Sequence, residues 1–166
     1  MAGGRRTKGR FVWPKQKIMR MCMDAVVQGV NEVNIELQAG LIENLSQSGS
    51  GKHYKGNRAP SSAPGEPPVA QTGHLRLSWT AGNAGHYNVK AQGRRVTSRY
   101  GQISVGSALK YARALEKGNP KNNLLPRPYI KPLVDAFNDM RLPTQIVQRH
   151  VDEMLVQINQ LTPRNV

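Results

Sequence analysis

Hydrophobic residues between Pro14 and Leu45 recur at steps of three and four, the period of a helix with one apolar face. Pro14 suits the first turn of a helix, where a missing N–H removes no hydrogen bond. The pattern predicts one helix from Pro14 to about Leu45, roughly 45 Å long, and favours packing of its apolar face on a sheet. Gly29 and Gly40 weaken the interior of this helix, each by about 1 kcal/mol relative to alanine, and mark a bend or a close contact. The apolar stripe comprises Ile18, Cys22, Val26, Val30, Val33, Leu37, Leu41 and Leu45, widened by Met21, Ala25 and Ile42.

The middle of the chain alternates between apolar and polar residues. Over residues 74–80, Leu75, Leu77 and Trp79 alternate with polar neighbours, as in a half-buried strand. Further strand-like pieces cover residues 86–91, 94–99 and 101–106, with glycine-containing turn signals between them. Short, closely spaced strands predict an antiparallel meander of about four strands.

After the strands the pattern returns to helices. We expect helices over Ala108 to Lys117, about Tyr129 to Met140, and Pro143 to about Leu161. The fold class predicted is therefore α+β: a long N-terminal helix, a small antiparallel sheet, C-terminal helices and a proline-rich arm. Residues 14–161 form the predicted domain, with an extended proline-rich loop at 46–73, a flexible basic arm at 1–13 and a loose tail at 162–166.

The stretch between the long helix and the first predicted strand is rich in proline, at positions 60, 64, 67 and 68. Proline fixes φ, lacks a donor and extends the residue before it. Gly65 supplies a turn position that tolerates positive φ. The segment is predicted to be an extended arm suited to lying along a neighbouring molecule. Gly51-Lys52 does not complete a phosphate loop, because Ser46 and His53 replace the required glycine and hydroxyl residue, so residues 46–56 are predicted to be a flexible linker.

Composition adds a strong charge signal. The 166 residues carry a formal net charge of +14, and only 38% are hydrophobic, so we expect one domain with a modest core. Such a charge indicates an anionic partner, although a soluble basic protein without a nucleic-acid role would look the same. Basic side chains of the predicted hairpin either line a DNA channel, meet an acidic neighbour or are simply solvated; they are Lys90, Arg94, Arg95 and Arg99.

Residue types that perform catalysis do not gather in any recognisable motif. The four histidines lack metal-ligand spacing, and the single cysteine, Cys22, cannot complete a thiolate site. Carboxylates are sparse in the basic middle, where we interpret Glu116 as a packing partner for a nearby arginine. We therefore expect no enzyme, cofactor or metal. The N-terminus lacks the apolar region of a signal peptide, and no apolar run reaches membrane-spanning length, so assembly in the cytoplasm is expected.

Three pieces of the chain together resemble a known family. The first is Ala59-Pro60, Gly65, Pro67-Pro68, Thr72-Gly73, Leu75 and Ser78; the second is Tyr111-Ala112, Glu116 and Gly118; the third is Pro126-Arg127-Pro128-Tyr129-Ile130. In this order they resemble the head–tail joining, or tail-completion, proteins of tailed bacteriophages. The similarity covers roughly residues 54–140.

The resemblance implies a non-catalytic virion protein of the neck, a tail-terminator type of component assembled in the host cytoplasm. It implies a homo-oligomeric ring, sixfold or twelvefold, that contacts the head connector and tail tube and touches packaged DNA without sequence preference. The subunit-interface candidates that follow from it are Pro60, Gly65, Pro67, Pro68, Thr72, Gly73, Tyr111, Glu116, Pro126, Arg127 and Pro128. The alternative is a stand-alone basic nucleic-acid-binding protein, favoured by charge alone and opposed by the lack of a recognition-helix signature.

Overall fold

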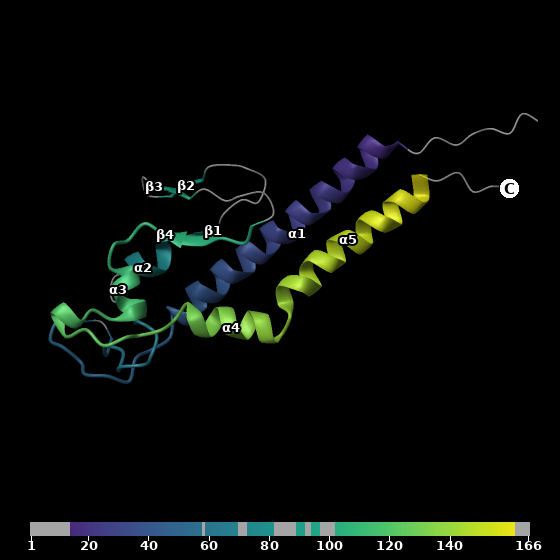
Figure 1. Ribbon diagram of the computed structural model, residues 1–166. Coiled ribbons are helices and arrows are strands. Elements are labelled where there is room, and N and C mark those ends of the chain that lie inside the picture. Colours follow the sequence, from purple (N-terminus) through teal and green to yellow (C-terminus); the bar gives the residue numbers. More distant parts are fainter. Residues whose placement is uncertain are drawn as a thin grey trace, which may run out of the picture.

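The computed structural model describes residues 14–57, 59–69, 73–81, 89–91, 94–96 and 102–161. Two long helices, α1 (Lys15–Asn44) and α5 (Leu142–Leu161), run side by side and project from a mixed part that holds the strands and short helices (Figure 1). The predicted N-terminal helix is thus confirmed. None of the helices in the described ranges is both long and apolar enough to span a membrane.

Among the described residues, the N-terminal half of α1 packs against α5 and not against a sheet. Ala25 forms a buried cluster with Met154 and Ile158 of α5. The helices approach closely at Gly29, where an added Cβ would lie 2.9 Å from the Cα of Val147. The expected helix-on-sheet packing is therefore wrong for this half, because the same apolar stripe is equally suited to a second helix.

The C-terminal half of α1 contributes to a second core, where it meets β1. Leu41 and Leu45 pack there with Trp79 and the fully buried Tyr129. The two rings meet edge to face, with centroids 5.8 Å apart and planes at 75°. The Tyr129 hydroxyl donates to the carbonyl of Ala112 at 3.2 Å, so the one polar atom of this side chain is satisfied.

The described strands form two separate antiparallel pairs and not one meander. β1 (Trp79–Ala81) pairs with β4 (Val105–Ser107), while β2 (Val89–Ala91) pairs with β3 (Arg94–Val96). The last strand therefore returns to the first, with the β2–β3 hairpin between them in the sequence. Turn signals identify a hairpin but do not say which strand its neighbours pair with.

Residues 74–77 form a helical turn, α2 (His74–Leu77), where a strand was predicted. Gly73 has φ of +74°, and the Leu77 N–H donates to its carbonyl at 2.9 Å. Leu75 and Trp79 are buried, but Leu77 is 72% exposed. The two buried residues are four positions apart, which is the spacing of a helical turn. The prediction of a strand from the alternation of apolar and polar residues was therefore wrong here.

The C-terminal helices are confirmed, the first two with shorter bounds and the last within one residue of its predicted bounds. They are α3 (Ala112–Lys117), α4 (Lys131–Asp139) and α5, with a 3₁₀ turn, η1 (Pro120–Asn122), after α3. Gly118 ends α3 with φ of +74°, and a Cβ there would lie 2.8 Å from the carbonyl oxygen of Leu124. Glycine is therefore required where the chain turns back toward α4.

Candidate assembly site

The proline-rich segment is folded back on its own chain over its described residues. The Gly51 N–H donates to the Ser61 carbonyl at 2.7 Å, and the Ser61 N–H donates to the Lys52 carbonyl at 3.1 Å. Ser62 and Pro68 are buried. The expected extended arm and flexible linker are thus replaced by an ordered loop, which we call the proline loop (residues 49–57 and 59–69). Proline blocks regular pairing but not this irregular contact.

Glu66 holds the two sides of the proline loop together. Its carboxylate accepts the Ala63 N–H at 2.9 Å, the Ser50 N–H at 3.1 Å and the Ser50 hydroxyl. The Ser50 hydroxyl, together with these N–H groups, lowers the pKa of the Glu66 carboxyl. Gly51 permits the close approach, because a Cβ there would lie 2.6 Å from the Ser61 carbonyl oxygen.

The proline loop contacts the segment after α3. Gly65, with φ of +87° as expected for a turn glycine, donates its N–H to the Pro126 carbonyl at 3.2 Å. The Arg127 N–H in turn donates to the Leu115 carbonyl of α3 at 2.8 Å. The three pieces that carry the family resemblance, separated in sequence, therefore form one contiguous unit.

Glu116 fixes the start of α4 and was misinterpreted from the sequence. Its carboxylate accepts the backbone N–H groups of Tyr129 at 2.8 Å and of Ile130 and Lys131 at 3.0 Å each. These donors belong to the helix N-terminus, where a negative charge is stabilising. Its partners are thus backbone amides and not the arginine that we expected. Burial, followed by the Glu116 charge, raises the pKa of the Tyr129 phenol.

A pocket of about 350 Å³ opens between the proline loop, α2 and α3. Four of the predicted interface residues line it: Pro68, Gly73, Tyr111 and Arg127. Three further predicted residues are half-buried and adjoin pocket-lining residues in the sequence: Pro60, Pro67 and Pro128. Pro126 is exposed, and Thr72 lies outside the described residues. The structure thus brings most of the predicted interface residues into one region.

The predicted basic hairpin is described only in its backbone. Lys90 lies opposite Arg95, and Arg94 lies opposite Ala91. The side chains of these residues, and Arg99 entirely, lie outside the described part, so the DNA-channel prediction stays a prediction.

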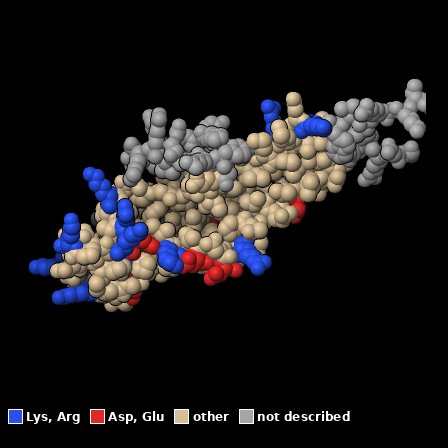
Figure 2. Space-filling view, viewed as in Figure 1, with Lys and Arg blue, Asp and Glu red and all other residues tan. Residues whose placement is uncertain are grey.

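A second basic surface was missed in the sequence. Lys110, Arg113 and Lys117 are exposed along α3 and its entry, and Lys121 follows in η1. Figure 2 shows lysine and arginine side chains gathered at this end of the molecule. The available signal was the spacing of Arg113 and Lys117, four residues apart within α3, because such a pair lies on one helix face; Lys110 precedes α3, and Lys121 follows Gly118, which ends it.

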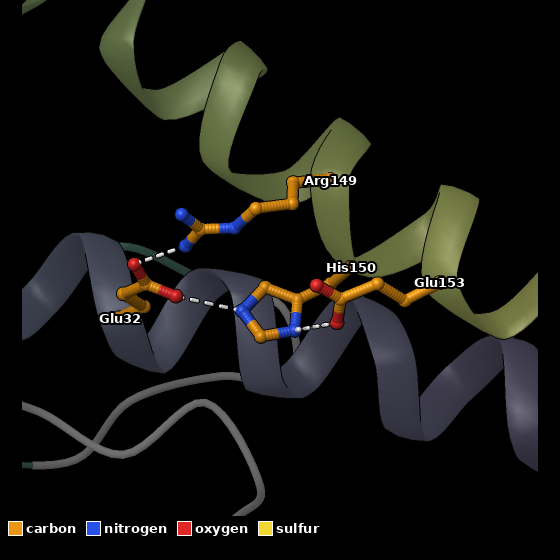
Figure 3. A network of polar contacts seen from close by, with 4 residues as sticks. All are labelled: Glu32, Arg149, His150 and Glu153. Carbon is orange, nitrogen blue, oxygen red and sulfur yellow. Dashed lines mark hydrogen bonds and ion pairs between the residues drawn. The ribbon is translucent and has the colours of Figure 1, made fainter.

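The α1–α5 pair carries a polar network that no motif had indicated (Figure 3). Glu32 of α1 accepts a hydrogen bond from Arg149 and lies 2.7 Å from His150 Nε2; His150 Nδ1 lies 3.9 Å from Glu153. Arg149 first, then His150, lowers the pKa of the Glu32 carboxyl. Beyond this network, toward the end of the pair where α1 begins and α5 ends, four large apolar side chains are exposed: Met19, Met23, Leu155 and Val156, which we call the apolar tip.

In the described part of the chain, no group of three or more His, Cys, Asp or Glu residues is arranged to hold a metal ion. The chain matches no protein-family model, no curated protein and no solved structure.

Proposed function

We propose that this chain is a structural virion protein of a tailed phage that completes the neck and joins head to tail as part of a ring around the DNA channel. The observation that carries the proposal is the unit formed by the proline loop, α3 and residues 126–130. These are the three pieces on which the family resemblance rests, and the Gly65–Pro126 and Glu116–Tyr129 hydrogen bonds join them. A motif whose members meet in space is stronger support than the same residues scattered over a fold.

Two surfaces at opposite ends of the protomer suit self-assembly. The proline loop unit lies at one end, and the apolar tip lies where α1 begins and α5 ends (Figure 1). Met19 is 61% exposed and Val156 is 56% exposed, so the tip retains apolar area that a neighbour would cover. Contacts between different surfaces of identical subunits are heterologous and close into rings when the rotation permits.

The protein partners follow from the family resemblance, and the contact with DNA follows from charge. The ring would contact the head connector on one side and the tail tube on the other. Packaged DNA would meet cations without base readout, because phosphate contacts carry no sequence information. The basic hairpin residues Lys90, Arg94, Arg95 and Arg99, and the basic face of α3, are the two candidate surfaces for this contact.

A stand-alone nucleic-acid-binding protein is the second candidate, favoured by the net charge of +14 and the basic face of α3. Native mass spectrometry of the full chain, with and without a DNA duplex, separates the two. A ring component assembles into one defined stoichiometry without DNA, or does so on addition of its neck partners. A chain that stays monomeric under both conditions and gains mass only with DNA contradicts the assembly role.

A further inference from the structure

We propose that the pocket between the proline loop and α3 binds a carboxylate that is carried on an extended segment of a partner protein. This binding site goes beyond the proposed neck function and does not depend on it. It needs only that the chain meet a partner with an accessible acidic residue.

Two buried hydrogen-bond donors in the pocket wall lack a partner. The Ser62 side chain belongs to a residue that is only 3% exposed, and its hydroxyl makes no hydrogen bond. The buried Nε of Arg127 is likewise unpaired. Both residues line the pocket. Because buried polar groups in proteins are nearly always satisfied, two unsatisfied donors in one wall indicate an acceptor that arrives from outside.

The acceptor that suits this wall is an anion. Among the described residues that line the pocket, Arg127 is the one that carries a charge. No carboxylate of the described residues lies within ion-pair distance of it. The carboxylates of the proline loop and of α3 already have partners, since Glu66 binds Ser50 and Ala63, and Glu116 binds the start of α4. The guanidinium charge is therefore free to pair with a ligand, and carboxylate is the planar anion it matches well.

The rest of the pocket favours a protein segment over a nucleic-acid backbone. Pro68, Leu75 and Leu115 give it apolar walls, and Tyr54 and Tyr111 are half exposed at its lining. Its volume is at the lower end of the roughly 300–1,000 Å³ typical of ligand pockets, enough for one side chain and its neighbours. A DNA strand presents successive phosphates and would instead favour the row of cations on α3.

The pocket is also formed in advance. The Gly51–Ser61 hydrogen bond and the Glu66 contacts hold the proline loop in shape. The Gly65–Pro126 hydrogen bond positions the loop beside Arg127. A binding segment therefore does not have to order the loop on arrival, which reduces the entropic cost of binding. Because Ser62 Oγ and Arg127 Nε are closed to solvent in this state, the Arg127 side chain has to rotate to open them to the incoming carboxylate.

The test is an NMR titration of the full chain with the blocked peptide Ac-ALEVA-NH2 and its neutral counterpart Ac-ALQVA-NH2. We expect the glutamate peptide to shift the side-chain Nε–H signal of Arg127 and the backbone amides of Ser62 and Gly73. The glutamine peptide should bind about tenfold more weakly, because it lacks the charge. Inorganic phosphate and a dT20 oligonucleotide serve as the competing anions.

Three variants separate binding from folding. Arg127→Gln should weaken binding of the glutamate peptide about tenfold, whereas Arg20→Gln, at an exposed cation of α1, should leave it unchanged. Ser62→Ala should weaken binding several-fold and keep or raise the thermal midpoint, because it removes a buried unsatisfied hydroxyl. Equal binding of the two peptides, stronger shifts with phosphate or dT20, or no shift with either peptide overturns the proposal.

Discussion

Replacement of Glu116 by alanine should destabilise the protein far more than an ordinary surface substitution. The change removes one acceptor from three N–H groups at the start of α4. Tyr129 is fully buried, so water cannot replace the lost acceptor of its N–H. Leaving this N–H without a hydrogen bond should cost about 1–3 kcal/mol. The N–H of the exposed Lys131 can be hydrated and should cost little. The lost charge at the helix N-terminus adds about 0.3–1 kcal/mol.

We therefore expect Glu116→Ala to lower the free energy of unfolding by about 2–4 kcal/mol, and Glu116→Gln, which keeps one oxygen acceptor, by about 1–2 kcal/mol. Urea unfolding followed by circular dichroism, at one fixed protein concentration, measures both. The exposed Glu43 provides the matched control, because Glu43→Ala should change stability by less than about 0.5 kcal/mol. A Glu116→Ala effect as small as that of the control would refute the capping role.

Three further predictions follow from particular contacts. Gly29→Ala should destabilise the protein by about 1–3 kcal/mol, because the new Cβ meets the Val147 backbone. Gly40→Ala, which meets only the tip of Leu133, should be neutral or stabilising by up to about 1 kcal/mol. Equal thermal shifts for the two variants contradict this account. The pKa of the Glu66 carboxyl is lowered in the folded protein. The stabilisation of the proline loop by the ionised carboxylate is therefore fully present above the ordinary carboxyl pKa and is lost as the pH falls through the lowered pKa. In an NMR pH titration, the amide signals of Ser50 and Ala63 should therefore shift together at a pH below the range where glutamate usually titrates. In the Glu66→Gln variant these signals should not show that shift. Changing all four basic hairpin residues (Lys90, Arg94, Arg95 and Arg99) to alanine should alter DNA retention in particles and leave assembly intact, whereas heads without tails would place these residues at a subunit interface.

Helices were predictable from this sequence wherever their apolar spacing was long and regular. The period of α1 gave its two ends to within a residue. It could not give the partner, because an apolar stripe fits a helix and a sheet equally well. The packing partner of α1 is decided by the close approach of Gly29 to Val147, two residues that lie more than a hundred positions apart in the sequence.

The irregular parts were harder to predict because their order comes from distant contacts. Proline density correctly excluded regular pairing over residues 59–68, but the Glu66 and Pro126 contacts that fold this segment leave no local pattern. Glu116 was singled out by the family resemblance, yet its partners are backbone amides, which every residue carries. Composition and spacing cannot reveal such a partner.

The most direct test of the proposed neck function is electron microscopy of particles from a phage that lacks this gene, with the gene supplied in trans as the control. The proposal predicts filled heads and separate tails in its absence, and joined virions when it is restored. An antibody against the chain should then label the head–tail junction. Normal numbers of joined, infectious virions without the gene would contradict the proposal.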